Sequence, residues 1–217
     1  MTHSLPTRLR RSRKILTIIR SLRWAFLFFG VLALGYCSYV FLSARYFQAR
    51  ERAQFTNLAS APSSPMPTLP LPLPVRFAPG SPIAELDIPS LSMRDVVIQG
   101  VSAADLRIAV GHIPGTALPW ENGNVVLSAH RTTFFRPLRK IRSGDLIALR
   151  TRYGSYWYRV RFTQIVKPTD VQVLAPHSYA SLTLTTCYPF YYIGSAPDRF
   201  IVVAARTAPQ TPAPNPR

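Results

Sequence analysis

A cysteine, an arginine and a histidine in the second half of the chain have the chemistry that acyl transfer requires. Cys187 ends a segment of alternating leucine and threonine that predicts a strand, and Arg199 stands at the start of the next predicted strand, directly before Phe200 to Ala204. His130 directly follows a third predicted strand, Val125 to Ala129. Turn-forming residues separate the first two strands, so an antiparallel pairing would bring Cys187 close to Arg199.

These three side chains could divide the work of a nucleophilic reaction. A thiolate attacks a carbonyl far better than a thiol does, so Cys187 needs a base or a nearby positive charge. His130 could be the proton acceptor or an imidazolium partner, and then the general acid for a departing amine. Arg199 stays protonated, so it could hold the substrate carbonyl or stabilise an oxyanion. The plain alternatives are a buried thiol, a strand-end histidine and a surface or ion-pair arginine.

The segments around this set resemble the sortases, and the class D sortases in particular. Thr183-Leu184-Thr185-Thr186-Cys187 is similar to the family signature Thr-Leu-x-Thr-Cys, and Arg199 stands at the position of the family's arginine. The strand from Asn124 to Arg131 is similar to the family's histidine strand. The resemblance extends over about Ile83 to Ala205, the whole predicted folded domain.

The sequence departs from the family pattern at three positions. Ala129 precedes the histidine and Trp120 follows the Leu-Pro pair, where the family usually has glycine at both places. Thr132 stands where the family has an aspartate after His-Arg. The resemblance therefore supplies no carboxylate at this position to assist His130.

The resemblance implies a membrane-anchored cysteine transpeptidase. Cys187 would form a thioester with a Leu-Pro-x-Thr-Gly-like sorting signal at the C-terminal end of a protein substrate, and an amine acceptor in the cell envelope would resolve it. Thr185 and Thr186 are weaker substrate-binding candidates, as are the aromatic Phe190 and Tyr191, which could line a peptide groove. No cofactor is expected.

Other readings of the same residues are less favoured. A papain-like peptidase has its cysteine before its histidine, and an L,D-transpeptidase has a Ser-x-Gly-Cys context, which differs from the Thr-Thr-Cys sequence here. A non-enzymatic surface β module that binds peptides remains the alternative from another class. Acidic clusters are absent, so we expect no metal site. His112 is interpreted as a turn or core residue more readily than as a site residue.

An apolar run predicts a single membrane span near the N-terminus. Residues 24–44 carry no charged side chain, and about 20 helical residues cross the hydrocarbon core of a bilayer. The run is longer than the apolar region of a cleaved signal peptide, which favours an uncleaved signal anchor. Seven Lys or Arg residues precede the span and three follow closely, which predicts a cytoplasmic tail, residues 1–23, and an extracytoplasmic C-terminal part.

The remainder of the chain divides by composition. Residues 45–80 are expected to be an extracytoplasmic linker, because prolines favouring polyproline II are frequent in their second half. Residues 81–207 are expected to be the catalytic domain, and the Pro-rich residues 208–217 a disordered tail. Cys37 lies in the apolar span, so Cys187 is the lone extracytoplasmic thiol and no disulfide is expected.

The domain has the pattern of a mainly β fold. Besides the three strands near the candidate site, the sequence predicts strands at Val96 to Ile98, Leu146 to Leu149 and Tyr156 to Ile165. A Ser102/Asp105 capping box predicts a short helix over Leu106 to Val110, and a helical turn is possible within 134–141. With the resemblance, we expect a closed antiparallel eight-stranded barrel with one or two short helices.

The positive charge of the chain does not indicate nucleic-acid binding. The formal net charge is +17, but ten basic residues and one acid fall within residues 1–52. Residues 81–207 hold fourteen basic and eight acidic residues, and these are scattered. The domain has no nucleic-acid-binding motif, so we expect no nucleic-acid partner.

Overall fold

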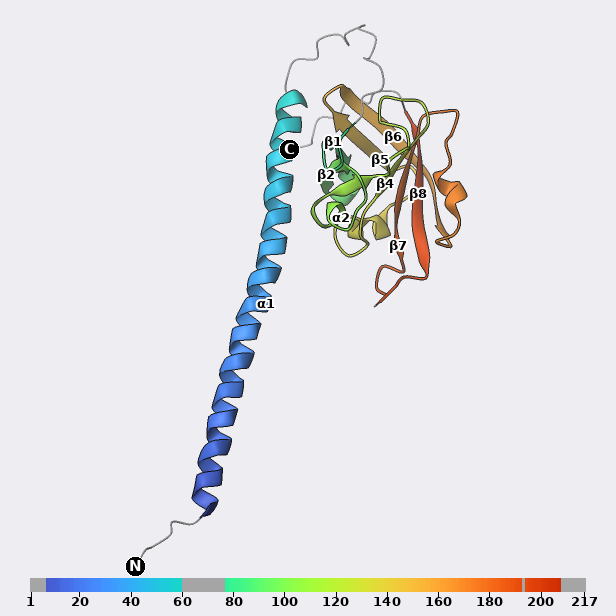
Figure 1. The fold of residues 1–217 in the computed structure, drawn as a ribbon. Coiled ribbons are helices and arrows are strands. Elements are labelled where there is room, and N and C mark those ends of the chain that lie inside the picture. Colours follow the sequence, from blue (N-terminus) through green and yellow to red (C-terminus); the bar gives the residue numbers. More distant parts are fainter. Residues whose placement is uncertain (1–6, 60–76, 193, 208–217) are drawn as a thin grey trace, which may run out of the picture. The chain divides into compact units, whose positions relative to one another are not determined.

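The computed structural model describes residues 7–59, 77–192 and 194–207. The chain forms two units, Met1–Ser43 and Ala44–Arg217. The first contains most of helix α1 (Thr7–Ala59), and the second contains the end of this helix and a β-barrel (Figure 1). The Pro-rich residues 60–76 and the predicted tail, 208–217, lie outside the described residues.

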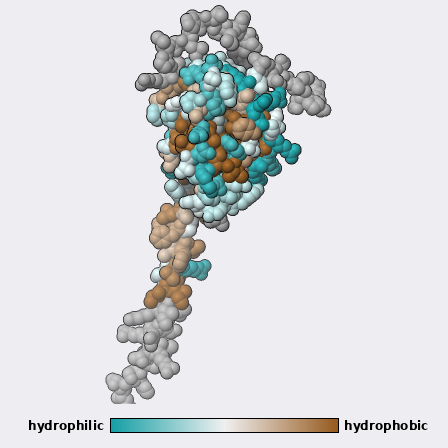
Figure 2. Space-filling model, turned by 90° about the vertical axis from the view of Figure 1, so that its right-hand side faces the viewer, coloured by the Kyte–Doolittle hydropathy of each residue, from teal (hydrophilic) through white to brown (hydrophobic). Residues whose placement is uncertain are grey.

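Helix α1 is long and apolar enough to cross a membrane. The segment Ile18–Ala53 has a mean hydropathy of 2.0 in its most apolar window, and none of that window is buried. Figure 2 shows a largely apolar surface along the part of the helix in view. The helix continues to Ala59, whereas the sequence was expected to form a linker from residue 45. Residues 45–59 contain no proline and several good helix formers, which explains the extension.

The barrel contains eight strands, one short α-helix and three 3₁₀ helices. The strands are β1 (Pro82–Ile88), β2 (Met93–Gln99), β3 (Val110–His112), β4 (Asn124–Ser128), β5 (Leu146–Thr151), β6 (Gly154–Val166), β7 (Ser181–Tyr188) and β8 (Asp198–Arg206). The helices are η1 (Pro89–Leu91), α2 (Asp105–Ile108), η2 (Arg136–Lys140) and η3 (Val171–Leu174).

The strands close in the order β1-β2-β3-β4-β7-β8-β6-β5, and β5 pairs with β1. The predicted closed eight-stranded barrel is therefore confirmed. Most pairs are antiparallel, but β2–β3 and β4–β7 are parallel. Parallel neighbours need a crossover connection, and the long segment between β4 and β7 provides one. This crossover places the end of β4 beside the end of β7.

The barrel interior is filled by aliphatic side chains. Leu86, Leu127, Leu149, Leu182 and Val202 are each at most 1% exposed and belong to one core cluster. They come from five different strands, so the core holds the strands in register. Burial of such side chains contributes roughly 1.5–3 kcal/mol each. The candidate site therefore rests on a well-packed framework.

The predicted short helix is present but ends earlier than expected. Ser102 and Asp105 form the reciprocal hydrogen bonds of a capping box, at 3.2 and 2.9 Å. Helix α2 ends at Ile108, whereas the sequence predicted helix to Val110. Val110 instead begins β3, where it pairs with Val97 of β2. The β-sheet pairing of this residue outweighs its helical pattern.

The end of α1 packs against the outside of the barrel within the second unit. The buried side chain of Gln48 accepts a hydrogen bond from the Val96 backbone N–H and donates one to the Ile108 carbonyl, both at 2.8 Å. Phe47 packs against a small cluster that contains Val96 and Ile98. Strand β3 pairs with β2 only from Val97 onward, so it does not pair with Val96. Gln48 supplies the acceptor for the Val96 backbone N–H in its place.

Candidate active site

The antiparallel pairing of β7 and β8 places the cysteine beside the arginine. Cys187 is the register partner of Arg199, and the flanking pairs are Thr186 with Phe200 and Tyr188 with Asp198. Directly opposed residues in a sheet project their side chains to the same face. Cys187 is a half-buried free thiol and Arg199 is also half-buried. The backbone ladder therefore fixes the relation between these two residues.

The histidine reaches the same place through the parallel pair β4–β7. Ser128 at the end of β4 is in register with Thr185, and the chain continues to Ala129 and His130. The buried hydroxyl of Thr186 donates a hydrogen bond to the Ala129 carbonyl at 2.7 Å. This bond fastens the residue before His130 to the residue before Cys187.

The three side chains line one cavity of about 310 Å³. His130 is exposed at its surface, and the threonines Thr185 and Thr186 contribute to its lining. Another part of the lining is a wall formed by the end of β6, the turn after it, η3 and one leucine of α2, through Val166, Lys167, Pro168, Asp170, Val171, Val173, Leu174 and Leu106. Most of this wall is apolar, which suits the side chains of a bound peptide.

This apolar wall was not predicted from the sequence. The residues of η3 have no clear period of 2 or 3.6, so the sequence offered no reason to place them at the candidate site. A run of Val171, Val173 and Leu174 after Pro168 is the available signal, because exposed apolar residues in a loop often mark a binding surface.

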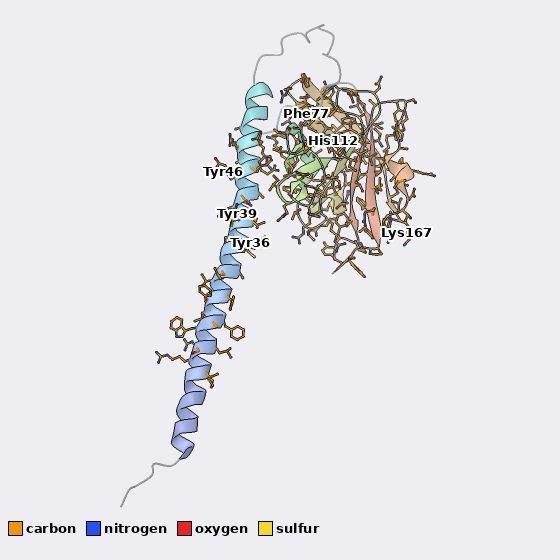
Figure 3. The ribbon with its side chains drawn as sticks, in the orientation of Figure 1. Tyr36, Tyr39, Tyr46, Phe77, His112 and Lys167 are labelled. Carbon is orange, nitrogen blue, oxygen red and sulfur yellow. The ribbon has the colours of Figure 1, made fainter. Side chains whose placement is uncertain are left out.

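The charge in the cavity is mainly positive. Arg199 and Lys167 both line it, and Asp170 is the one carboxylate in its lining among the described residues. Lys167 forms a 2.7 Å salt bridge with Asp198, the neighbour of Arg199, and Figure 3 shows Lys167 beside the lower ends of β7 and β8. The Arg199 guanidinium donates to the Asp198 carbonyl at 3.0 Å. Both cations could stabilise negative charge that develops on a substrate in this cavity.

A buried arginine next to the histidine was missed by sequence reasoning. Arg131 is 9% exposed, and its Nη2 donates to the carbonyls of Tyr192 and Gly194 at 2.8 and 2.9 Å. Both carbonyls belong to the connection between β7 and β8. Arg131 therefore joins the chain that carries His130 to the connection that links Cys187 with Arg199.

The weaker substrate-binding candidates separate into two groups. Thr185 and Thr186 line the cavity, although the Thr186 hydroxyl is used by the Ala129 carbonyl. Phe190 and Tyr191 lie outside the lining. The Phe190 ring packs on the rings of Tyr188 and Phe200, with centroids 6.0 and 5.3 Å apart. Tyr191 is 75% exposed.

His112 lies at the end of β3 and does not line the cavity that contains Cys187. It is 2% exposed, with its Nδ1 2.9 Å from Gln99 Oε1 and its Nε2 3.0 Å from the Ala117 carbonyl. Burial lowers the pKa of His112 below its usual range, which favours the neutral ring. Within the part of the chain that the structure describes, no group of three His, Cys, Asp or Glu side chains could hold a metal ion.

Comparison with known proteins finds relatives of this chain. The Sortase domain family matches residues 86–207. Sortase D of Bacillus subtilis is 39% identical over 122 residues, which are 56% of this chain and 62% of that protein. Sortase SrtE1 of Streptomyces coelicolor is 33% identical over 54% of this chain and 38% of its own length. The chain therefore spans less than two thirds of either relative.

Solved structures show the same fold. A Sortase D5 transpeptidase of Clostridium perfringens superposes with a TM-score of 0.57 at 28% identity, covering 61% of this chain and 83% of that one. Sortase C of the same species, solved with the C-terminal cell wall sorting motif, gives a TM-score of 0.56 at 30% identity over 61% and 74%. The family match covers more than half of the chain. It includes the whole barrel except residues 82–85, at the start of β1. The chain belongs to the sortase family.

Proposed function

We propose that this chain is a cysteine transpeptidase that cleaves a sorting signal and transfers the acyl part to an amine. The observation that carries the proposal is the convergence of Cys187, His130 and Arg199 on one cavity, at the ends of three adjoining strands. Sortase membership supports the reaction class.

In the first half-reaction the Cys187 thiolate attacks the carbonyl carbon of the scissile peptide bond. The carbonyl electron pair moves to oxygen, and the Arg199 guanidinium stabilises the resulting oxyanion. When the intermediate collapses, the C–N bond breaks and His130 donates a proton to the departing amine. The products are a thioester on Cys187 and the released C-terminal fragment of the substrate.

In the second half-reaction an acceptor amine attacks the thioester carbonyl. His130 accepts a proton from the amine nitrogen, and the C–S bond breaks to restore the Cys187 thiolate. An amide bond replaces the one that was cleaved, so no net hydrolysis occurs. Water in place of the amine would give hydrolysis.

The substrate is proposed to be a protein with a Leu-Pro-x-Thr-Gly-like sorting signal near its C-terminus. The apolar wall formed by Val166, Val171 and Leu174 could receive the apolar side chains of an extended peptide. The related sortase C was solved with a C-terminal cell wall sorting motif, which supports the same substrate class here.

The location is proposed to be the cell membrane. Helix α1 contains one segment with the length and hydropathy of a membrane span. The basic residues before the span favour a cytoplasmic N-terminus and an extracytoplasmic barrel, which would present the site to amines of the cell envelope. The catalytic roles given to Cys187, His130 and Arg199 are part of this proposal.

The proposal is tested with the full chain in detergent micelles, a library of Leu-Pro-x-Thr-Gly-like peptides and a set of amine acceptors. Mass spectrometry should find an acyl-enzyme on Cys187 and a ligated product. The Cys187→Ala variant should form neither. Cys37→Ala is the matched control, because that thiol lies on α1, and it should keep full activity.

Two results would count against the proposal. Cleavage without ligation for every amine would reassign the chain to the peptidases. Peptide binding without any thioester would indicate a non-enzymatic binding module.

A further inference from the structure

A second and larger cavity lies outside the candidate active site. It has a volume of about 710 Å³ and is built by η1, η2 and the turns that flank η2. It shares no lining residue with the cavity that contains Cys187. Its lining includes three hydroxyl groups, from Ser90, Ser92 and Thr133. Nothing in the proposed transpeptidation uses this space.

The cavity concentrates basic side chains. Arg136, Arg139, Lys140 and Arg142 all line it, with Asp145 as the one acid. Asp145 accepts a hydrogen bond from the Arg142 backbone N–H at 2.8 Å, so its carboxylate also serves the local turn. Four cations within seven residues repel one another when no anion lies between them.

Apart from Asp145, the acids that form salt bridges pair with basic residues elsewhere. In the described ranges, the salt bridges of Glu85, Asp87, Asp95 and Asp198 go to Arg52, Arg94, Arg150 and Lys167. None of them reaches η2. Across the same described ranges, the exposed side chains of Arg136, Lys140 and Arg142 take part in no salt bridge. They are therefore available to a ligand from solution.

We propose that this cavity binds a multiply charged anion that carries phosphate or carboxylate groups. Guanidinium groups present paired N–H donors that match both groups, and three of the four cations are arginines. The three hydroxyls can donate further hydrogen bonds to anionic oxygens. A volume of about 710 Å³ accommodates several linked anionic groups better than a single ion. The expected ligand class is a soluble oligoanion.

The cavity is connected to both chain segments that bear the candidate catalytic residues. The Arg139 guanidinium donates to the Tyr191 hydroxyl and lies 5.4 Å from the centroid of its ring. Tyr191 belongs to the connection between β7 and β8. Thr133, which lines the cavity, donates its backbone N–H to the His130 carbonyl at 3.3 Å. A bound anion would therefore lie next to the segments that position Cys187, His130 and Arg199.

Binding is tested by isothermal titration calorimetry of the full chain in neutral detergent micelles, with sodium tripolyphosphate as the probe. The double variant Arg136→Gln/Arg142→Gln removes two cavity cations. The double variant Arg152→Gln/Arg161→Gln is the matched control, because it removes the same charge from exposed arginines outside the cavity. We expect one saturable site, with a dissociation constant at least about tenfold higher in the cavity variant and within about twofold of the original in the control.

Three other arms decide the outcome. Citrate should compete with tripolyphosphate, because its carboxylates match the same donors, whereas monophosphate should compete poorly. The absence of saturable binding, or an equal loss in both double variants, would overturn the proposal in favour of general surface charge. If the cavity variant lost only its affinity for vesicles with anionic lipid headgroups, a membrane surface would replace the soluble oligoanion as the ligand. All of these experiments measure binding and none measures peptide cleavage. Their outcome therefore does not depend on the proposed transpeptidation.

Discussion

Cys187 and Arg199 are directly opposed across the antiparallel strands β7 and β8. Side chains at such positions have Cβ atoms about 4.5–5.5 Å apart and lie on one face of the sheet. The spacing of nucleophile and guanidinium is thus set by the hydrogen-bonded ladder of the barrel. The connection between β7 and β8 is not needed to set this spacing.

The Arg199 guanidinium should matter for the reaction and little for the fold. We expect Arg199→Ala to lower kcat/KM for a sorting peptide at least about a hundredfold, because the loss of an oxyanion donor costs roughly 2.7–4 kcal/mol. Arg206→Ala is a control on the same strand, where the guanidinium lies 4.4 Å from the Tyr156 ring centroid. Steady-state peptide assays compare the two. Equal losses in both variants would remove the special role of Arg199.

The Thr186 hydroxyl should position the histidine segment. Thr186→Val keeps the shape of the side chain but removes the hydrogen bond to the Ala129 carbonyl. We expect the free energy of unfolding to fall by about 1–3 kcal/mol, because a buried carbonyl loses its donor. The pH profile of kcat should also change, because His130 follows Ala129. Thr186→Ser should restore both, and an unchanged pH profile would limit Thr186 to a structural role.

Arg131 should hold the connection between β7 and β8 in place. Arg131→Gln removes the two hydrogen bonds to the Tyr192 and Gly194 carbonyls, and hydrogen bonds from a charged donor contribute roughly 1.5–3 kcal/mol each. Chymotrypsin should then cleave after Tyr192 faster, and kcat should fall. Arg161→Gln, on the exposed face of β6, should change neither rate. An unchanged cleavage rate in Arg131→Gln would show that other contacts hold the connection.

Asp95 should make stability depend on pH between about 4 and 6. Burial raises the pKa of Asp95 to about 6, although Arg52 opposes the shift from 3.1 Å away. The folded state therefore binds the proton more tightly than the unfolded state, so this carboxyl lowers stability as pH rises through that window. Above the folded pKa the cost is constant. A shift of about two pKa units corresponds to roughly 3 kcal/mol at most.

Asp95→Asn isolates this effect. The free energy of unfolding of the original chain, minus that of the variant, should decrease from pH 4 to pH 6 and then level off. Urea unfolding of both proteins in the same micelles measures the difference at each pH. A difference that grows with pH would mean that the Arg52 ion pair outweighs burial.

Local patterns in the sequence predicted the barrel strands near the site. Strand β7 shows its alternation directly, and the end of that alternation places Cys187 at a strand end. The neighbours of β4 could not be predicted in this way, because its parallel pairing with β7 joins residues more than fifty positions apart. Residues 45–59 were included in the expected linker because the prolines farther along dominated the composition, although these residues contain no proline and form helix. Arg131 was missed because its partners are backbone carbonyls, which leave no pattern in the sequence.

The contact between Gln48 and the Val96 backbone closes a ring of chain between residues 48 and 96. The ring leaves α1 at Ala59 and returns through β1 and β2. A single proteolytic cut between Ala59 and Pro82 would break the covalent path but leave the ends of the ring joined by Gln48 and by the packing of Phe47. Shedding of the barrel from its helix would therefore require both a cut and the release of this contact.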